Sequence, residues 1–377
     1  MYIPRLISSK IEEAQSYYPV TVITGPRQSG KTSLCKHLFP TYTSVNLESL
    51  TMRNYASTDP EGFLASLGDR VVIDEVQNVP QLLSEIQVAV DKDRTRRYIL
   101  TGSSNLLLTK TVTQSLSGRA SIFTLLPFSF PELNKKKLEE TSTNALIYEG
   151  LYPGVIADHI PPNIFYANYV TTYIEKDVRD LLKVTNLIKF DNFLRMTALR
   201  SGSEFNATSI SKEVGVSATT ISGWLSILNA SYIIFQVQPY YKNINKRLTK
   251  MPKIYFYDTG LLAYLLGLEN SEQIEKSPFK GMLFENLAMT ELIKQAINRG
   301  MKPNIFFYRE HSGKEVDALE ERGGQLSFYE IKSSGTFHAD FFKNMEYLKG
   351  ILGDVTSETL IYDGETFPPK LLNIRDV

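Results

Sequence analysis

The residues from Gly25 to Ser33 have the types and the spacing that bind a polyphosphate. Backbone N–H groups of such a loop surround the phosphate oxygens, so Gly25 and Gly30 must let the main chain turn tightly and approach the ligand. Lys31 then reaches the β and γ phosphates, and the Thr32 hydroxyl completes the oxygen shell of a Mg²⁺ ion. We therefore predict that ATP and Mg²⁺ bind to Gly25-Pro26-Arg27-Gln28-Ser29-Gly30-Lys31-Thr32-Ser33.

Two adjacent acids, Asp74 and Glu75, supply the second part of this chemistry. They follow the apolar run 70–73, which is typical of a buried parallel strand. Ligands bind at the carboxyl edge of an open α/β sheet, which gives both acids a reason to stand there. We expect Asp74 to hold the Mg²⁺ shell and Glu75 to polarise the water that attacks the γ-phosphate. The alternative is a solvated turn, but the strand and the upstream loop favour catalysis.

A polar strand end at Ser103 follows the run 97–102. A hydroxyl or amide at this place lies between the acidic strand and the phosphate loop, where it senses the γ-phosphate. Ser103 is the first candidate for this role and Asn105 is the second. The alternative for Ser103 is a helix N-cap, and the sequence leaves both roles open.

The elements that position these residues alternate between strands and helices. Such alternation predicts an α/β fold with a parallel sheet covered on both faces. The pattern indicates helices over 5–17 and 32–39 and strands over 20–24, 43–47, 70–75, 97–105 and 122–125.

Five motifs of the chain belong together: Gly-Pro-Arg-Gln-Ser-Gly-Lys-Thr, Val-Ile-Asp-Glu-Val-Gln, Leu-Thr-Gly-Ser-Ser, Leu-Ser-Gly-Arg-Ala and Leu-Leu-Pro-Phe-Ser-Phe-Pro-Glu. Together they resemble a large prokaryotic family of AAA+ type ATPases, in which the ATPase is fused to a C-terminal domain of unknown function. The resemblance implies that Arg119 is an arginine finger that reaches the γ-phosphate of a neighbouring subunit, which requires a homo-oligomer. The alternative is a structural arginine paired with a local carboxylate.

The middle of the chain predicts a helix-turn-helix. A long helix over 166–184 carries an aromatic stripe that we interpret as core. The segment 208–225 then has the spacing of two helices around a Gly-centred turn, with Ser217 as the N-cap of the second helix. A wing strand is expected from Tyr232 to Val237. The exposed start of the second helix lacks the Arg, Lys or Gln that read bases, so phosphate contact or packing on the ATPase is as well supported as base reading.

The segment 240–253 is the most basic stretch of the chain, with five cations interleaved with tyrosines. Such a stretch suits contact with phosphates and stacking on bases, whereas the alternative is a solvated loop. Because a helix-turn-helix precedes it, we predict DNA as a partner, held mainly through phosphates.

The last third predicts a helix over 281–299 and strands over 305–309, 314–320 and 326–332. Glu285 lies on this helix, Asp317 in the middle strand, and Glu330-Ile331-Lys332 at the end of the third strand. Together they resemble the core of PD-(D/E)xK nucleases, although Val316 replaces the proline of that family. The resemblance implies that Mg²⁺ or Mn²⁺ binds to the acids while Lys332 orients the attacking water. The sequence leaves open whether the site is active or degenerate. The metal ligands expected here are Glu285, Asp317 and Glu330.

Length and composition set the outer limits of the interpretation. The 377 residues exceed one ordinary core, and the 41 basic and 41 acidic residues cancel, so any basic surface must be local. Cys35 has no internal disulfide partner, and no apolar run reaches the ~18 residues that span a bilayer, so we expect a cytoplasmic protein without a membrane partner. The predicted domains are an AAA+ type ATPase domain (1–150), a helical connector (151–188), a winged helix-turn-helix (189–240) and a nuclease-like domain (241–377).

The sequence therefore predicts an ATPase that couples nucleotide turnover to DNA binding or processing. One alternative is a nucleotide-driven switch whose C-terminal domains bind a protein partner without cleavage. The other is an ATP-driven DNA remodeller whose nuclease fold only guides the strand.

Overall fold

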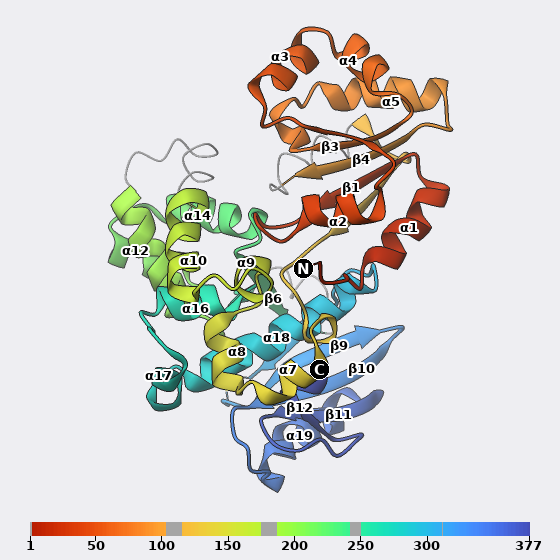
Figure 1. The fold of residues 1–377 in the computed structure, drawn as a ribbon. Coiled ribbons are helices and arrows are strands. Elements are labelled where there is room, and N and C mark those ends of the chain that lie inside the picture. The colour runs from red at the N-terminus through yellow and green to blue at the C-terminus, as the bar shows by residue number, and fades with distance from the viewer. Residues whose placement is uncertain (1, 103–114, 175–186, 242–249, 311) are drawn as a thin grey trace. The chain divides into compact units, whose positions relative to one another are not determined.

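The computed structural model describes residues 2–102, 115–174, 187–241, 250–310 and 312–377 (Figure 1). They form two compact units. The first unit is Met1–Phe128 with Ala230–Tyr232 and Ile297–Met301, and the second is Ser129–Asn229 with Ile233–Ala296 and Lys302–Val377. Ser103, Asn105, residues 242–249 of the basic stretch and the end of the helix predicted over 166–184 lie outside the described residues.

The first unit is built on a five-stranded sheet with the order β2-β3-β4-β1-β5. Every neighbouring pair in it is parallel, which requires a crossover between consecutive strands. The α/β fold with a parallel sheet is therefore confirmed. The strands are β1 (Val20–Thr24), β2 (Thr43–Asn46), β3 (Arg70–Asp74), β4 (Arg97–Gly102) and β5 (Ala120–Thr124).

Helices cover both faces of this sheet (Figure 1). Successive side chains of a strand point to opposite faces, so Val71 and Ile73 pack into one core while Val72 packs into the other. The first core is closed by α3 (Leu50–Thr58), α4 (Pro60–Leu67) and α5 (Leu82–Lys92), and the second by α1 (Ser8–Tyr17) and α2 (Lys31–Leu38).

The second unit contains a seven-stranded mixed sheet with the order β12-β11-β10-β9-β8-β6-β7. The strand β6 pairs antiparallel with β7 and parallel with β8, so the expected wing strand lies in the same sheet as the strands of the last third. The strands are β6 (Ile234–Pro239), β7 (Lys253–Phe256), β8 (Ile305–Arg309), β9 (Glu315–Arg322), β10 (Gln325–Lys332), β11 (Val355–Tyr362) and β12 (Leu371–Asn373).

Most helices of the second unit precede this sheet in the chain. The helix expected from 166 begins earlier, because Pro162 suits a first helical turn, and it changes to a π-helix over Val170–Ile174. The described α-helices are α7 (Lys135–Glu140), α8 (Thr143–Glu149), α9 (Pro153–Ile156), α10 (Pro162–Tyr169), α12 (Leu187–Ala198), α13 (Ala207–Val214), α14 (Ala218–Ala230), α16 (Thr259–Leu265), α17 (Ser271–Lys276), α18 (Lys280–Asn298) and α19 (Lys343–Leu352).

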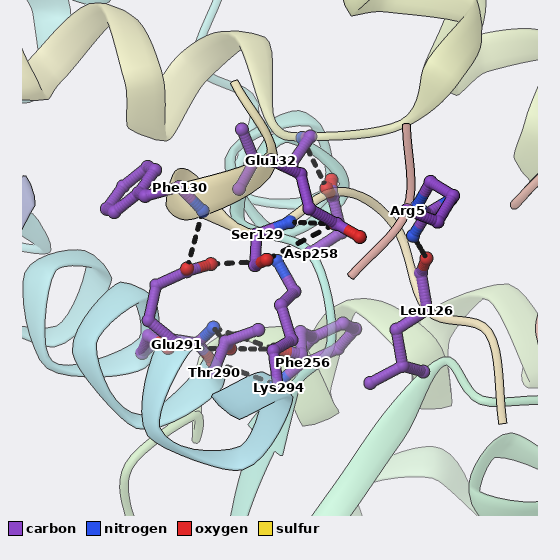
Figure 2. Close-up of polar contacts among 12 residues, drawn as sticks. Arg5, Leu126, Ser129, Phe130, Glu132, Phe256, Asp258, Thr290, Glu291 and Lys294 are labelled. Carbon is purple, nitrogen blue, oxygen red and sulfur yellow. Dashed lines mark hydrogen bonds and ion pairs between the residues drawn. The ribbon is translucent and has the colours of Figure 1, made fainter. Parts of the chain in front are cut away.

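A buried ion pair on α18 anchors the segment that follows β5 (Figure 2). Lys294 Nζ lies 2.9 Å from Glu291 Oε1, and both side chains are buried. The other oxygen of Glu291 accepts the N–H of Phe130 at 2.8 Å, while Ser129 N donates to Glu132 at 2.9 Å. Because buried charges need partners, these bonds hold the start of the second unit in one conformation.

Candidate nucleotide site and a second acidic site

The phosphate loop lies between β1 and α2, and its glycines are required by geometry. Gly25 has a φ of +147°, and a Cβ there would lie 2.1 Å from the carbonyl oxygen of Leu125. Gly30 has a φ of +94° and is the N-cap of α2. A side chain at Gly25 would displace the backbone at Leu125, directly after β5, and a left-handed residue at Gly30 turns the chain into the helix.

Lys31 turns its buried ammonium group back to the loop. Its Nζ donates to the carbonyl oxygens of Gly25 at 3.0 Å and Pro26 at 2.8 Å. Burial lowers the pKa of Lys31 to about 8, although the nearby Glu75 and Asp74 carboxylates oppose this shift. Phosphate oxygens accept hydrogen bonds more strongly than carbonyls do, so a bound polyphosphate would attract this ammonium away from the loop.

Asp74 and Thr32 meet at the carboxyl end of the sheet. Thr32 Oγ1 donates to Asp74 Oδ2 at 2.6 Å, and Thr101 Oγ1 donates to Asp74 Oδ1. A hydroxyl beside a carboxylate is a donor set that suits Mg²⁺, so the residues present fit the expected ion. Thr101 was not among the residues predicted for this site, although it belongs to the Leu-Thr-Gly-Ser-Ser motif at the end of β4.

Glu75 directly follows β3 in a left-handed conformation with a φ of +56°. This backbone is uncommon for a residue with a side chain, and such strain is frequent at functional sites. Glu75 accepts a hydrogen bond from the side chain of Gln77. The structure therefore brings Lys31, Thr32, Asp74 and Glu75 to one end of the sheet, whereas their catalytic roles stay predictions.

The second unit brings together the four residues expected of a nuclease-like site. Lys332 Nζ lies 2.6 Å from Glu330 Oε1 and 3.7 Å from Asp317 Oδ2. Burial, with the Asp317 charge as the next cause, raises the pKa of Glu330 to about 8. Glu330 Oε2 is buried and has no hydrogen-bond partner among the described residues. Burial raises the pKa of Glu285 on α18, and the nearby Asp317 charge also raises it.

A lysine that the sequence argument did not assign to this site completes it. Lys253 Nζ lies 3.3 Å from Glu285 Oε1 and 2.5 Å from Glu315 Oε1. The sequence did contain a signal for this pairing: Lys253 is the first residue of an otherwise apolar strand, and a lysine buried there needs a carboxylate partner. In the part of the chain that the structure describes, no three His, Cys, Asp or Glu side chains are spaced to hold one metal ion. Because Lys253 and Lys332 already pair with these acids, the side chains as placed leave no free carboxylate cluster for a divalent ion.

The helix-turn-helix forms as the sequence predicts, with α13 and α14 on either side of Gly215. Ser217 Oγ accepts the N–H of Thr220 at 3.0 Å, which confirms the expected N-cap. Ile221 and Trp224 of α14 are buried. The isolated bridge between Glu204 and Lys253 adds a third antiparallel segment beside β7 and β6.

Comparison with known families decides the identity of the first unit. A family model described as an AAA domain matches residues 17–134, which contain the phosphate loop, the Asp74-Glu75 strand end and β1 to β5. The N-terminal part of this chain is an AAA+ type phosphate-loop ATPase domain. Two further family models, described as domains of unknown function (DUF8612 and DUF4143), match residues 140–272 and 280–374.

Relatives of this chain come from bacteria and archaea. An uncharacterised protein of Mycobacterium tuberculosis is 26% identical over 333 residues, which are 87% of this chain and 74% of the relative. An uncharacterised protein of Methanocaldococcus jannaschii is 25% identical over 358 residues, 84% of this chain and 75% of the relative. A Walker-type ATPase of Pyrococcus abyssi of solved structure has a TM-score of 0.44 and 17% identity, and covers 69% of this chain and 94% of that one.

Arg119 is the residue for which the sequence predicts an arginine-finger role, and in the structure it pairs with a nearby carboxylate. Arg119 Nε lies 2.6 Å from Asp91 Oδ1, and Nη2 lies 2.7 Å from Asp91 Oδ2. This bidentate pair is the local contact that the sequence left open as an alternative. The arginine-finger role in a neighbouring subunit stays a prediction.

A second arginine, Arg5, bonds the backbone of the phosphate loop in the AAA+ domain. Arg5 donates to the carbonyl oxygen of Ser29 at 2.9 Å and to that of Leu126 at 2.5 Å, the latter drawn in Figure 2. Its guanidinium lies 4.6 Å from the ring centroid of Phe128. Nothing in the sequence around Arg5 indicated this contact.

No helix in the described part of the chain has the length and apolar character that a membrane span requires.

Proposed function

We propose that this AAA+ type ATPase couples ATP hydrolysis to DNA contact by its second unit. The observation that carries the DNA part is the pairing around the basic stretch. Residues 203–205, β7 and β6 form a small antiparallel arrangement after α12 and around α13 and α14, as in a winged helix. The wing of such a module is the connection between its last two strands, here 240–252.

Four of the five cations of the basic stretch fall in this connection along the sequence, and we propose that they contact a nucleic-acid backbone. The fifth is Lys253, which is buried and therefore unavailable to phosphates. Thr219 and Ser222 are exposed on α14 and lack strong base-reading groups. We therefore propose binding without sequence preference.

The ATPase reaction uses the residues at the carboxyl end of the first sheet. Lys31 binds the β and γ phosphates, Thr32 and Asp74 hold Mg²⁺, and Glu75 orients the attacking water. Bound Mg²⁺ supplies charge neutralisation at the phosphates. β5 ends at Thr124, and six residues later the N–H of Phe130 donates to Glu291 in the second unit. We propose that this short segment of chain transmits changes at the nucleotide site.

The ATPase part is tested by measuring phosphate release from ATP by wild type and Lys31→Ala. We expect the variant to lose turnover, because no other group can replace the buried ammonium. Arg53→Ala, which changes a cation on α3, is the control and should keep the wild-type rate. Equal rates for wild type and Lys31→Ala would contradict the proposal.

The DNA part is tested by fluorescence anisotropy with a labelled duplex at several salt concentrations. Four phosphate contacts predict an affinity that falls roughly a hundredfold between about 50 and 200 mM salt. The pair Lys246→Ala and Arg247→Ala should reduce the salt slope by about two. The matched pair Lys135→Ala and Lys136→Ala removes two exposed cations of α7 and should not change the slope.

A switch that binds a protein partner is the second candidate. The observation that favours it is the polar, uncharged exposed start of α14 together with the balanced charge of the chain. Salt-independent or absent DNA binding by a protein with full ATPase activity would support this candidate over the first.

A further inference from the structure

Lys253 enters the second acidic site because of strand alternation. Residues two apart on a strand share a face, so Lys253 and Tyr255 of β7 point to the same side. Both reach Glu285: the ammonium lies 3.3 Å from Oε1, and the Tyr255 hydroxyl donates to the same oxygen at 2.7 Å. Only 3% of the Lys253 side chain is exposed.

The strand that carries Lys253 is tied to the helix that carries Glu285. The amide of Asn286 on α18 accepts the N–H of Phe256 at 2.8 Å and donates to the carbonyl oxygen of Phe256 at 2.8 Å. Asn286 is fully buried, and Ser201 donates to the same amide oxygen at 2.8 Å. The backbone of β7 is therefore held against α18 near Glu285, so the position of Lys253 follows from the main chain.

Each of two lysines in this site lies beside two of its four acids. Lys253 neutralises Glu285 and Glu315, while Lys332 lies against Glu330 and Asp317. Arg309 also approaches Glu315, at 3.6 Å, but half of its side chain is exposed. Each acid thus already faces a protein cation.

We propose that Lys253 is the built-in cation of this site, which occupies the place between helix acid and strand acid where a divalent ion would otherwise be held. Its ammonium bridges the Glu285 and Glu315 carboxylates and holds them together without Mg²⁺ or Mn²⁺. The acidic site is then a closed, lysine-neutralised centre in which the expected nuclease metal does not bind. This inference does not depend on ATP hydrolysis or DNA binding.

The test is calorimetric titration of the full chain with MnCl₂ in an Asp74→Asn background, which removes the carboxylate expected to hold metal at the nucleotide site. We expect no Mn²⁺ binding by this background protein. Lys253→Met should create a Mn²⁺ site with an affinity at least tenfold above the detection limit of the titration, and adding Glu285→Gln should abolish it. Lys343→Met, which removes an exposed lysine paired with Asp340, should create no site.

Thermal unfolding supplies a second readout. Removing one partner of a buried ion pair is strongly destabilising, so Lys253→Met should lower the unfolding midpoint by about 5–10 °C, and Mn²⁺ should restore part of the loss. The double change Lys253→Gln with Glu315→Gln removes both charges of one contact and serves if the single variant does not fold. It should also gain Mn²⁺ binding.

The proposal is overturned if the background protein binds Mn²⁺ stoichiometrically and loses it on Glu330→Gln. It is also overturned if neither Lys253 variant gains affinity for Mn²⁺. Both results are independent of the ATPase and DNA assays, so the failure of this proposal and the failure of the proposed function are distinguishable.

Discussion

The chemistry of single residues in the nucleotide site is governed by burial. Lys31 is buried against carbonyl oxygens with a pKa lowered to about 8, so near neutral pH the free protein is close to losing this charge. Phosphates favour the charged form and raise the pKa again on binding. ATP binding and protonation of Lys31 are therefore linked.

This linkage predicts how ATP affinity depends on pH. Above the free pKa of about 8, binding must take up a proton at Lys31, so affinity should fall by up to tenfold per pH unit. Below that value Lys31 is already protonated, and the dependence should vanish. Calorimetry in two buffers of different ionisation enthalpy measures both effects, with Lys36→Ala on the exposed face of α2 as the control. Constant affinity without proton uptake above pH 8 would contradict this prediction.

Thr101 makes a second prediction at the residue scale. Thr101→Val removes a donor to the buried Asp74 carboxylate, so we expect turnover to fall about tenfold or more and the Mg²⁺ requirement to rise. Thr101→Ser keeps the hydroxyl and should keep the rate. The matched control is Thr21→Val, which removes a buried hydroxyl of β1 that contacts Ser121. Steady-state ATPase assays over a Mg²⁺ series would decide, and equal losses in both valine variants would refute a specific role.

At the scale of elements, the side-chain amide of Asn286 pairs with backbone groups of β7 that a neighbouring strand would otherwise bond. Asn286 of α18 bonds both backbone groups of Phe256 and so gives β7 a partner on the side away from β6. Buried backbone groups must be paired, which makes this contact necessary rather than incidental. This contact ties β7 to α18, the long helix of the last third, within one unit.

We expect Asn286→Leu to lower the free energy of unfolding of the second unit by about 2–5 kcal/mol, because two backbone groups lose their partners. Trp224, the one tryptophan of the chain, lies in α14 and reports the unfolding of this unit by fluorescence in urea. Asn168→Leu, at an exposed position of α10, is the control. A midpoint for Asn286→Leu equal to that of the control would show that the amide is dispensable.

At the scale of the whole molecule, the question is whether one subunit completes the site of another. Lys31→Ala removes a site residue and Arg119→Ala removes the predicted finger, so each variant alone should be inactive. If Arg119 acts in a neighbouring subunit, an equal mixture should recover roughly a quarter of wild-type ATPase activity, because one in four neighbour pairs is then complete.

The matched control for this experiment mixes Lys31→Ala with Glu75→Gln. Both changes fall in the same site, so no neighbour can complete it, and no activity should return. Absence of recovery in the Arg119 mixture as well would mean that Arg119 serves only its bidentate pair with Asp91.

The phosphate loop, the acidic end of β3, the parallel sheet of the AAA+ domain and the two helices around Gly215 could all be predicted from the sequence alone. These features depend on short spacings and on periodicity, which act between near neighbours in the chain. Glu330 and Lys332 were likewise placed together from strand alternation alone, because two residues on one strand share a face.

Only the tertiary structure decided which distant residues meet. Thr101 on Asp74, Arg5 on Ser29 and Lys253 on Glu285 join positions that lie 27, 24 and 32 residues apart. Such contacts depend on strand order and on which helix packs against which strand, and no local pattern records either. Burial then sets the charges, since the same lysine is solvated on a loop and needs a carboxylate in a core.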